Sequence, residues 1–396
     1  MTGTTGTTAA APTAAQQDAA VMQQVLTQSI LSDLRISNSS GINPTNQPSV
    51  VIEQANKGLT LGFLVRVKAT INNTEASGGA SLTATNFGPA NIFDKIVYTD
   101  YDSTDRINVS ARNLVLLNAL RHGGYMGTGI DSYDAAGDLI PASGQWPVSN
   151  WPKTIAAAAS ATVEFWMYVP LARAPHRNDF RGAVFSQISG KTANLTLNFA
   201  AAATAIGSDN MRSAYTGATG TVSNVAVECW QMYYDNLPTV GKTATSPGGY
   251  LMAPLSWSTL YQILDGPLSD LPIANDYAYF NFTTVREYFG VGITYNNGNT
   301  FNQGSDIVDM AFFRNISTPT RTWTPNKLTM ETRRLLSRAD LPAGCYFFDF
   351  DYKPVSLSVY GNSRLGIKAG TVNSGAALYK MEEFLLPQTA LPMVMG

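Results

Sequence analysis

Apolar and polar side chains alternate along the chain between Leu61 and Asn72. The even positions include Arg66, Lys68 and Thr70, and the odd positions are apolar throughout. A period of two is typical of a β-strand with one buried face, whereas an amphipathic helix repeats its apolar residues every three or four positions. We therefore predict a long strand whose buried face consists of Leu61, Phe63, Val65, Val67, Ala69 and Ile71.

A second β-rich run, Ile92–Tyr98, follows a break at Gly88-Pro89. The connection between the two runs, Asn73–Asn86, is polar and rich in glycine. Two long strands joined by such a connection predict the start of an antiparallel sheet.

Short runs of the same kind continue to the end of the chain, with a turn signal at Asn296–Gly298. After the N-terminal region, helical patterns are confined to short stretches such as Arg112–Leu120 and Lys327–Leu336, so strands and helices do not alternate. We predict an all-β chain made of two β-sandwiches of jelly-roll or Greek-key type. The further strands are expected at Val50–Ile52, Thr162–Leu171, Leu195–Phe199, Ser223–Tyr234, Tyr279–Thr284, Tyr288–Tyr295, Ile307–Arg314, Cys345–Asp349, Val355–Tyr360 and Ala376–Leu386.

The N-terminal region carries the one long helical pattern. Thr13 and Gln16 form a capping box, and apolar residues then recur every three or four positions as far as Leu34. An amphipathic helix ahead of an all-β body either packs on its own sheet or contacts a neighbour or a membrane surface. Its apolar face, the expected contact site, consists of Val21, Met22, Val25, Leu26, Ile30 and Leu34.

The length of 396 residues predicts two domains. We place an N-terminal segment at 1–48, a first jelly roll at 49–237, a linker at 238–249 and a second jelly roll at 250–396. The linker is rich in proline, glycine, serine and threonine. The irregular stretch His122–Pro152 is expected to be a functional or contact loop.

Composition narrows the function classes. Charged residues make up only 14% of the chain, which suits either contact with copies of the same protein or long neutral loops. The net charge of −2 argues against direct binding of nucleic acid. Cys229 and Cys345 form no disulfide framework and indicate a reducing compartment, and neither a signal peptide nor a membrane span is visible.

No group of residues predicts catalysis, so we expect neither enzymatic activity nor a cofactor. The two histidines, His122 and His176, form no pair with a cysteine or with each other at the spacing of a zinc site. Gly241-Lys242-Thr243 lacks the upstream glycine of a phosphate loop. Calcium could bind acidic loops, but solvated turns are favoured, and strand aromatics are attributed to core packing. The acidic loops contain Asp100, Asp102, Asp105, Asp349 and Asp351. The aromatic residues within predicted strands are Trp166, Trp230, Tyr233, Tyr234, Phe280, Phe289, Phe347 and Phe348.

Four blocks stand in order within about Val50–Phe384: GFLVRVKATIN from Gly62, FGPANIFDKIVY from Phe87, Ser258–Tyr261, and TRRLLSRADLPAGCYFFDFDYKPVSLSVYGN from Thr332. In sequence and in order they resemble the major capsid protein of tectiviruses, which are icosahedral phages with an internal lipid membrane. The last block is the most specific.

This resemblance implies two eight-stranded jelly rolls in one chain. It further implies that the protein forms pseudo-hexagonal homotrimers, which tile an icosahedral shell. The protein would be made in the host cytoplasm, and its partners would include minor capsid and vertex proteins. The N-terminal helix would lie toward the internal membrane. Because Arg35 is its one cation against Asp18 and Asp33, apolar or protein contact is a better expectation than attraction to anionic lipid. The alternative function is a β-sandwich carbohydrate-binding or receptor-binding spike protein.

Overall fold

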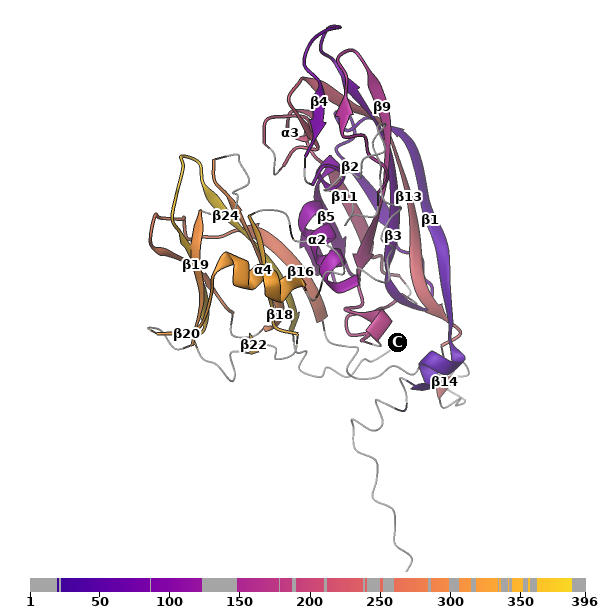
Figure 1. Ribbon diagram of the computed structural model, residues 1–396. Helices are drawn as coiled ribbons and strands as arrows, with labels where there is room; N and C mark the ends of the chain where they lie inside the picture. Colours follow the sequence, from indigo (N-terminus) through magenta and orange to yellow (C-terminus); the bar gives the residue numbers. More distant parts are fainter. Residues whose placement is uncertain are drawn as a thin grey trace, which may run out of the picture.

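The computed structural model of the chain describes residue 20 and residues 23–386 with internal gaps. The gaps are 86, 123–147, 178, 187–189, 210–211, 238, 241–249, 252–259, 284–285, 299–305, 315–317, 334, 336–340, 342–343, 352–354 and 357–361. The described residues form two β-sandwiches that lie side by side (Figure 1). No helix among these residues is long and apolar enough to cross a membrane.

The first sandwich is built from residues of the N-terminal half and contains one longer helix, α2 (Ala111–His122). Its other elements, in chain order, are β1 (Ile30–Ile42), β2 (Ser49–Glu53), β3 (Leu59–Asn73), β4 (Leu82–Ala84), η1 (Ala90–Ile92), β5 (Phe93–Thr99), β6 (Asp105–Val109), β7 (Val148–Asn150), β8 (Thr154–Ile155), β9 (Ser160–Pro170), η2 (Pro175–Arg177), β10 (Val184–Phe185), β11 (Asn194–Phe199), α3 (Ala202–Ala205), β12 (Tyr215–Thr216) and β13 (Gly220–Asp235).

The second sandwich contains α4 (Pro325–Arg333), whose first turn is capped by Thr324 through a hydrogen bond from the Lys327 amide. Before it, β14 (Thr239–Val240) and β15 (Tyr250–Leu251) pair with each other. The remaining strands are β16 (Leu260–Pro267), β17 (Tyr277–Asn281), β18 (Glu287–Asn296), β19 (Ile307–Phe313), β20 (Pro319–Trp323), β21 (Cys345–Asp349), β22 (Val355–Ser356), β23 (Arg364–Ala369) and β24 (Ala377–Leu386).

The two sandwiches have the same topology. When the described strands of five or more residues are numbered 1 to 8 along each half, both halves contain one sheet of order 1-8-3-6 and one of order 2-7-4-5, with every pair antiparallel. This is the order of an eight-stranded jelly roll, and it confirms the predicted fold class. The sheets are β1-β13-β3-β9 and β2-β11-β5-β6 in the first half, and β16-β24-β18-β21 and β17-β23-β19-β20 in the second.

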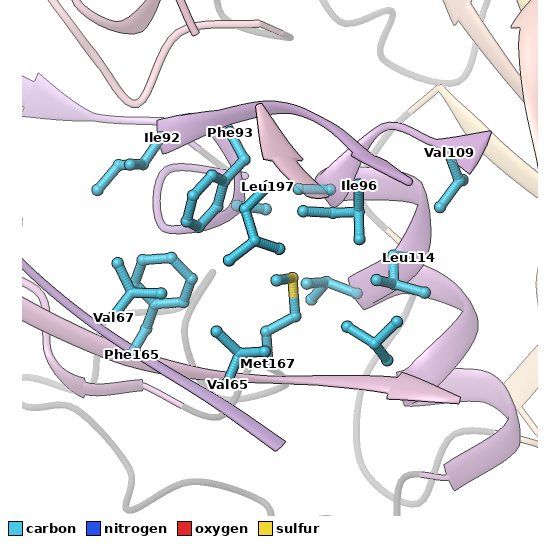
Figure 2. Close-up of a cluster of buried hydrophobic side chains, with 14 of the residues drawn as sticks. Val65, Val67, Ile92, Phe93, Ile96, Val109, Leu114, Phe165, Met167 and Leu197 are labelled. Atoms are coloured by element: carbon cyan, nitrogen blue, oxygen red, sulfur yellow. The ribbon is translucent and has the colours of Figure 1, made fainter. Parts of the chain in front are cut away.

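The alternation that predicted β3 is confirmed by burial. Its odd-numbered side chains from Leu61 to Ile71 are all buried, while Arg66 and Lys68 lie on the opposite, partly exposed face. The predicted pairing of β3 with β5 is wrong, because β5 belongs to the facing sheet. Figure 2 shows the resulting core, in which Val65 and Met167 of one sheet face Ile96 and Leu197 of the other.

The predicted N-terminal helix is wrong from Ile30 onward. Residues 23–28 are helical, but Ile30–Ile42 form β1, which pairs with β13 from Ile30↔Asp235 to Ile42↔Val225. The expected N-terminal segment 1–48 therefore contains the strand Ile30–Ile42. The physical reason is that β13 offers a full row of backbone donors and acceptors, and a strand satisfies these groups as well as a helix does.

Deleting residues 2–19 removes no described strand, so we expect an unchanged melting temperature. Deleting residues 2–42 removes β1 and leaves the backbone of β13 unpaired along one edge, so we expect loss of cooperative melting and aggregation. Differential scanning calorimetry of both truncations checks this. A 2–42 deletion that melts like the full chain would show that β1 is not needed for the first sandwich.

Candidate functional site: the junction between the two sandwiches

The two sandwiches are joined by a continuous sheet. Strand β6 at the edge of the first sandwich runs parallel to β16 of the second, with Ile107 opposite Ile263 and Asn108 opposite Leu264. Helix α2 lies beside this seam, between the two sandwiches (Figure 1). The side chains that line the seam can therefore fix the position of one sandwich against the other.

Asp265 of β16 caps helix α2 of the other sandwich. Its carboxylate accepts a hydrogen bond of 2.6 Å from the Ser110 amide and one of 2.9 Å from the Asn113 side chain. The first amides of a helix lack partners within the helix and favour a negative charge, so this carboxylate stabilises α2. Next to it, the Gln262 side chain donates to the Asp105 carbonyl at 2.7 Å.

Glu383 of β24 lies at the centre of the junction and has no solvent exposure. Arg121, at the end of α2, donates to Glu383 Oε2 from Nε at 2.9 Å and from Nη2 at 2.7 Å. Its Nη1 donates to Asp349 at 2.9 Å and its Nη2 also donates to the Phe289 carbonyl at 3.0 Å. The guanidinium, itself 3% exposed, thus holds groups from three strands of the second sandwich.

A second arginine of the first sandwich completes the cluster. Arg173 lies 3.6 Å from Glu383, pairs with Asp179 at 2.6 Å and forms an ion pair with Asp351. Its guanidinium lies over the Phe289 ring at 4.0 Å. The phenol of Tyr261 donates to Glu383 Oε1 at 3.1 Å, so both oxygens of the buried carboxylate have partners.

The charges of this cluster shift the pKa values of Asp179, Asp351 and Arg121 in directions that keep these three groups ionised. Burial raises the pKa of Asp179, but hydrogen bonds and charges from Arg181 and Arg173 outweigh it and hold the pKa below its usual range. Asp351 behaves in the same way beside Arg173 and Arg121. Burial lowers the pKa of Arg121, and Glu383 and Asp349 raise it above its ordinary value. The cluster is therefore a set of paired charges, as expected of residues that hold the two sandwiches together.

Gly290 leaves room for this ion pair. A Cβ atom built at Gly290 would lie 2.8 Å from Glu383 Oε2 and 2.4 Å from the Phe347 ring. A side chain at this point of β18 would therefore displace the carboxylate that Arg121 binds.

The acidic loops selected from the sequence serve as structural turns and pairs. Asp100 accepts hydrogen bonds from the amides of Asp102 and Thr104 and from Arg106 Nε at 2.7 Å. Asp349 and Asp351, expected to be a solvated turn, instead pair with Arg121 and Arg173 across the junction. No cluster of metal-binding side chains occurs in the parts of the chain that the structure describes.

The predicted core aromatics divide into two groups. Phe280, Phe289, Phe347, Phe348 and Tyr233 are buried, as expected. Tyr234 is partly buried and packs against Phe180. Trp166 and Trp230 are only partly buried, so core packing is the wrong interpretation for them. They stack at 5.4 Å on the outer face of the first sandwich, with the Arg66 guanidinium 5.6 Å from the Trp166 ring.

The cysteines and the other candidates are placed as follows. Cys229 and Cys345 are free and buried, and burial raises the pKa of each thiol to about 12. The Gly241-Lys242-Thr243 segment and most of the His122–Pro152 loop lie outside the described residues, as do the side chains of His122 and His176.

The four described N-terminal contact residues lie on two different elements. Val25 is fully buried against a small apolar cluster that includes Leu59 and Phe180, and Leu26 packs beside it. Ile30 and Leu34 belong to β1, where Ile30 is 57% exposed. Val21 and Met22 lie outside the described residues.

Sequence reasoning missed the junction residues Arg121, Arg173, Asp265 and Glu383. Their partners lie far away in the chain, and Glu383 follows Lys380-Met381-Glu382, a run that resembles a solvated strand face. A usable signal was the pair of glycines in the otherwise aromatic and β-branched strand Tyr288–Tyr295, because a glycine within a strand often marks a close approach.

Solved structures of viral capsid proteins share this architecture. The chain aligns with the crystal structure of the STIV MCP at a TM-score of 0.64 and 13% identity, covering 91% of this chain and 100% of that one. It aligns with PBCV-1 VP54, fitted into a reconstruction of the virophage Sputnik, at a TM-score of 0.56 and 8% identity, covering 90% and 93%. The duplicated strand order and these alignments define the double jelly-roll fold.

Sequence comparison gives the particular family. Residues 6–250 match the family model of the P3 major capsid protein N-terminal domain, and residues 258–392 match that of its C-terminal domain. The chain is 29% identical over 384 residues to the major capsid protein P3 of Enterobacteria phage PRD1, covering 95% of this chain and 90% of that protein. The chain belongs to the P3 major capsid protein family and is a component of the virion capsid. The resemblance to tectiviral capsid proteins is confirmed, and the spike alternative is set aside.

Replacing Arg121 with methionine removes the charge that compensates Glu383 and leaves a carboxylate buried without its main partner. Breaking one side of such a pair typically costs about 3–5 kcal/mol. The matched control is Arg35→Met, which removes a largely exposed partner of Glu228 and is expected to cost less than about 1 kcal/mol. Urea denaturation followed by tryptophan fluorescence measures both, and equal costs would contradict the role of the junction.

Acid should weaken the junction only below the ordinary aspartate pKa of about 3.9. The pKa values of Asp179 and Asp351 are lower in the folded than in the unfolded chain, so the unfolded chain binds more protons as pH falls. Their stabilisation is complete above that pKa and is lost as pH falls through the folded-state values. Melting temperatures measured from pH 7 to pH 2 should stay flat to about pH 4 and then decrease. Asp351→Asn should make the decrease shallower, and an identical acid profile for this variant would contradict the assignment.

Proposed function

We propose that this capsid protein forms homotrimers with a pseudo-hexagonal outline, which tile an icosahedral shell around an internal membrane. The main support for the proposal is that one jelly-roll topology occurs twice in the chain. Buried ion pairs hold the two halves in a fixed arrangement. Three such chains present six similar sandwiches around a three-fold axis. The proposed division is a first jelly roll up to 237, a linker at 238–249 and a second jelly roll at 250–396, with β1 added to the first.

The proposed role is structural, without enzymatic activity. The charged residues at the junction are paired with each other, and Arg121, Arg173 and Glu383 among them are buried. The proposed partners are other copies of the chain, minor capsid and vertex proteins, and the internal membrane, with synthesis in the host cytoplasm. Because Val25 and Leu26 pack on the first sandwich, membrane contact would fall to the residues before them.

Cleaving the chain within residues 241–249 should leave a trimer in which both halves remain associated. Each half alone would expose one side of the junction, including Glu383 in the second half and Arg121 in the first. Expression of residues 250–396 alone should therefore give aggregated protein, and the full chain should show no folded monomer during unfolding. Size-exclusion chromatography with light scattering checks both outcomes. A full chain that stays monomeric at micromolar concentration would overturn the proposal.

A further inference from the structure

The junction inside the chain pairs two specific topological positions. Strand β6 is the fifth of the eight strands of the first sandwich, and β16 is the first of the eight strands of the second. They run parallel where they meet. The sandwiches have the same strand order, so each chain also contains a fifth strand in the second sandwich and a first strand in the first sandwich. These counterparts are β20 and β1.

Both counterparts end their sheets without a further partner strand among the described residues. Their burial differs from that of the strands at the internal junction. Four of the five residues of β20 are exposed, whereas β6 has none exposed. Most of β1 is exposed or partly exposed, whereas the first half of β16 is buried. The fifth and first strands are thus more buried at the internal junction, where they pair with each other, and more exposed in β20 and β1, where no further partner strand is described.

We infer that β20 of one chain pairs in parallel with β1 of a second copy, repeating between chains the β6–β16 contact within each chain. The inference rests on the proposed assembly and names its interface. The occupant is a second copy because β6–β16 shows that this topology supplies both sides of such a contact. The two edges differ, so the contact is heterologous, and repeating it around an axis can close a ring.

The character of β1 supports this pairing. It is 13 residues long, contains no proline, and carries only two charged side chains, Asp33 and Arg35. Long edge strands without protective prolines or many charges are templates for pairing with another chain. Ile30 is 57% exposed and Leu31 is 47% exposed at its start, and Met330 is 61% exposed on α4, the helix that follows β20. Helix α2 follows β6 in the same way, and it packs against the other sandwich at the internal junction.

Cysteine cross-linking of the full chain tests the inference. Thr322→Cys on β20 is combined in one chain with Asp33→Cys or, separately, with Asn38→Cys on β1, since the register between the chains is open. All three positions are exposed. The native cysteines are buried and serve as silent background. The matched control combines Thr322→Cys with Val51→Cys, which is 62% exposed on β2, another edge strand of the first sandwich.

Mild oxidation should convert at least one β20–β1 variant into covalent dimers and trimers on a non-reducing gel, at least tenfold more than the control. Light scattering of the reduced proteins is run in parallel. A trimer that cross-links as poorly through β1 as through β2 would overturn the β20–β1 interface and leave the proposed trimer intact. A monomer in every reduced sample, including the unmodified chain, would overturn the proposed function itself. Hydrogen exchange gives a second readout, because the β20 amides should be protected in the trimer.

Discussion

The burial of Glu383 is the constraint on which the two-sandwich arrangement depends. A carboxylate without solvent exposure is costly unless opposite charges and hydrogen bonds compensate it. Both compensating arginines, Arg121 and Arg173, come from the first sandwich, while Glu383 lies on the last strand of the second. Separating the sandwiches would leave Glu383 without Arg121 and Arg173, and these arginines without Glu383. The two halves are therefore expected to behave as one cooperative unit, and the larger hydrophobic cluster also runs across the seam, since it includes Ile263 and Phe347 of the second sandwich.

The same constraint explains local features that look unrelated. Helix α2 must end where Arg121 can reach β24, and its start is fixed by Asp265 from β16. Gly290 must lack a side chain, because a Cβ would meet the Glu383 carboxylate. Helix, glycine and acid thus form one arrangement that fixes the angle between the sandwiches.

How far the sequence predicts this structure depends on how local each determinant is. The alternation in Leu61–Ile71 predicts β3 because the two faces of a central strand meet different surroundings. The edge strand β1 escaped prediction because its apolar residues, with Ile30 and Leu34 four apart, also fit a helix. Only the pairing with β13, some 200 residues away, distinguishes the two structures. The partnership of Arg121 with Glu383 escaped for the same reason, because it joins residues 262 positions apart.

A rigid internal junction also bears on the choice between a closed shell unit and an open filament. Heterologous contacts form a ring only if the rotation from one unit to the next divides a full turn, and otherwise they continue into a fibre. In a trimer of duplicated sandwiches, half of these rotations are set within the chain. Salt bridges between exposed groups would tolerate a range of angles, whereas a buried guanidinium that binds a carboxylate, a second acid and a backbone carbonyl at once tolerates few. Burying these charges costs desolvation free energy, and the structural gain is a fixed angle between the two sandwiches. Hydrophobic packing at the seam would restrict this angle less.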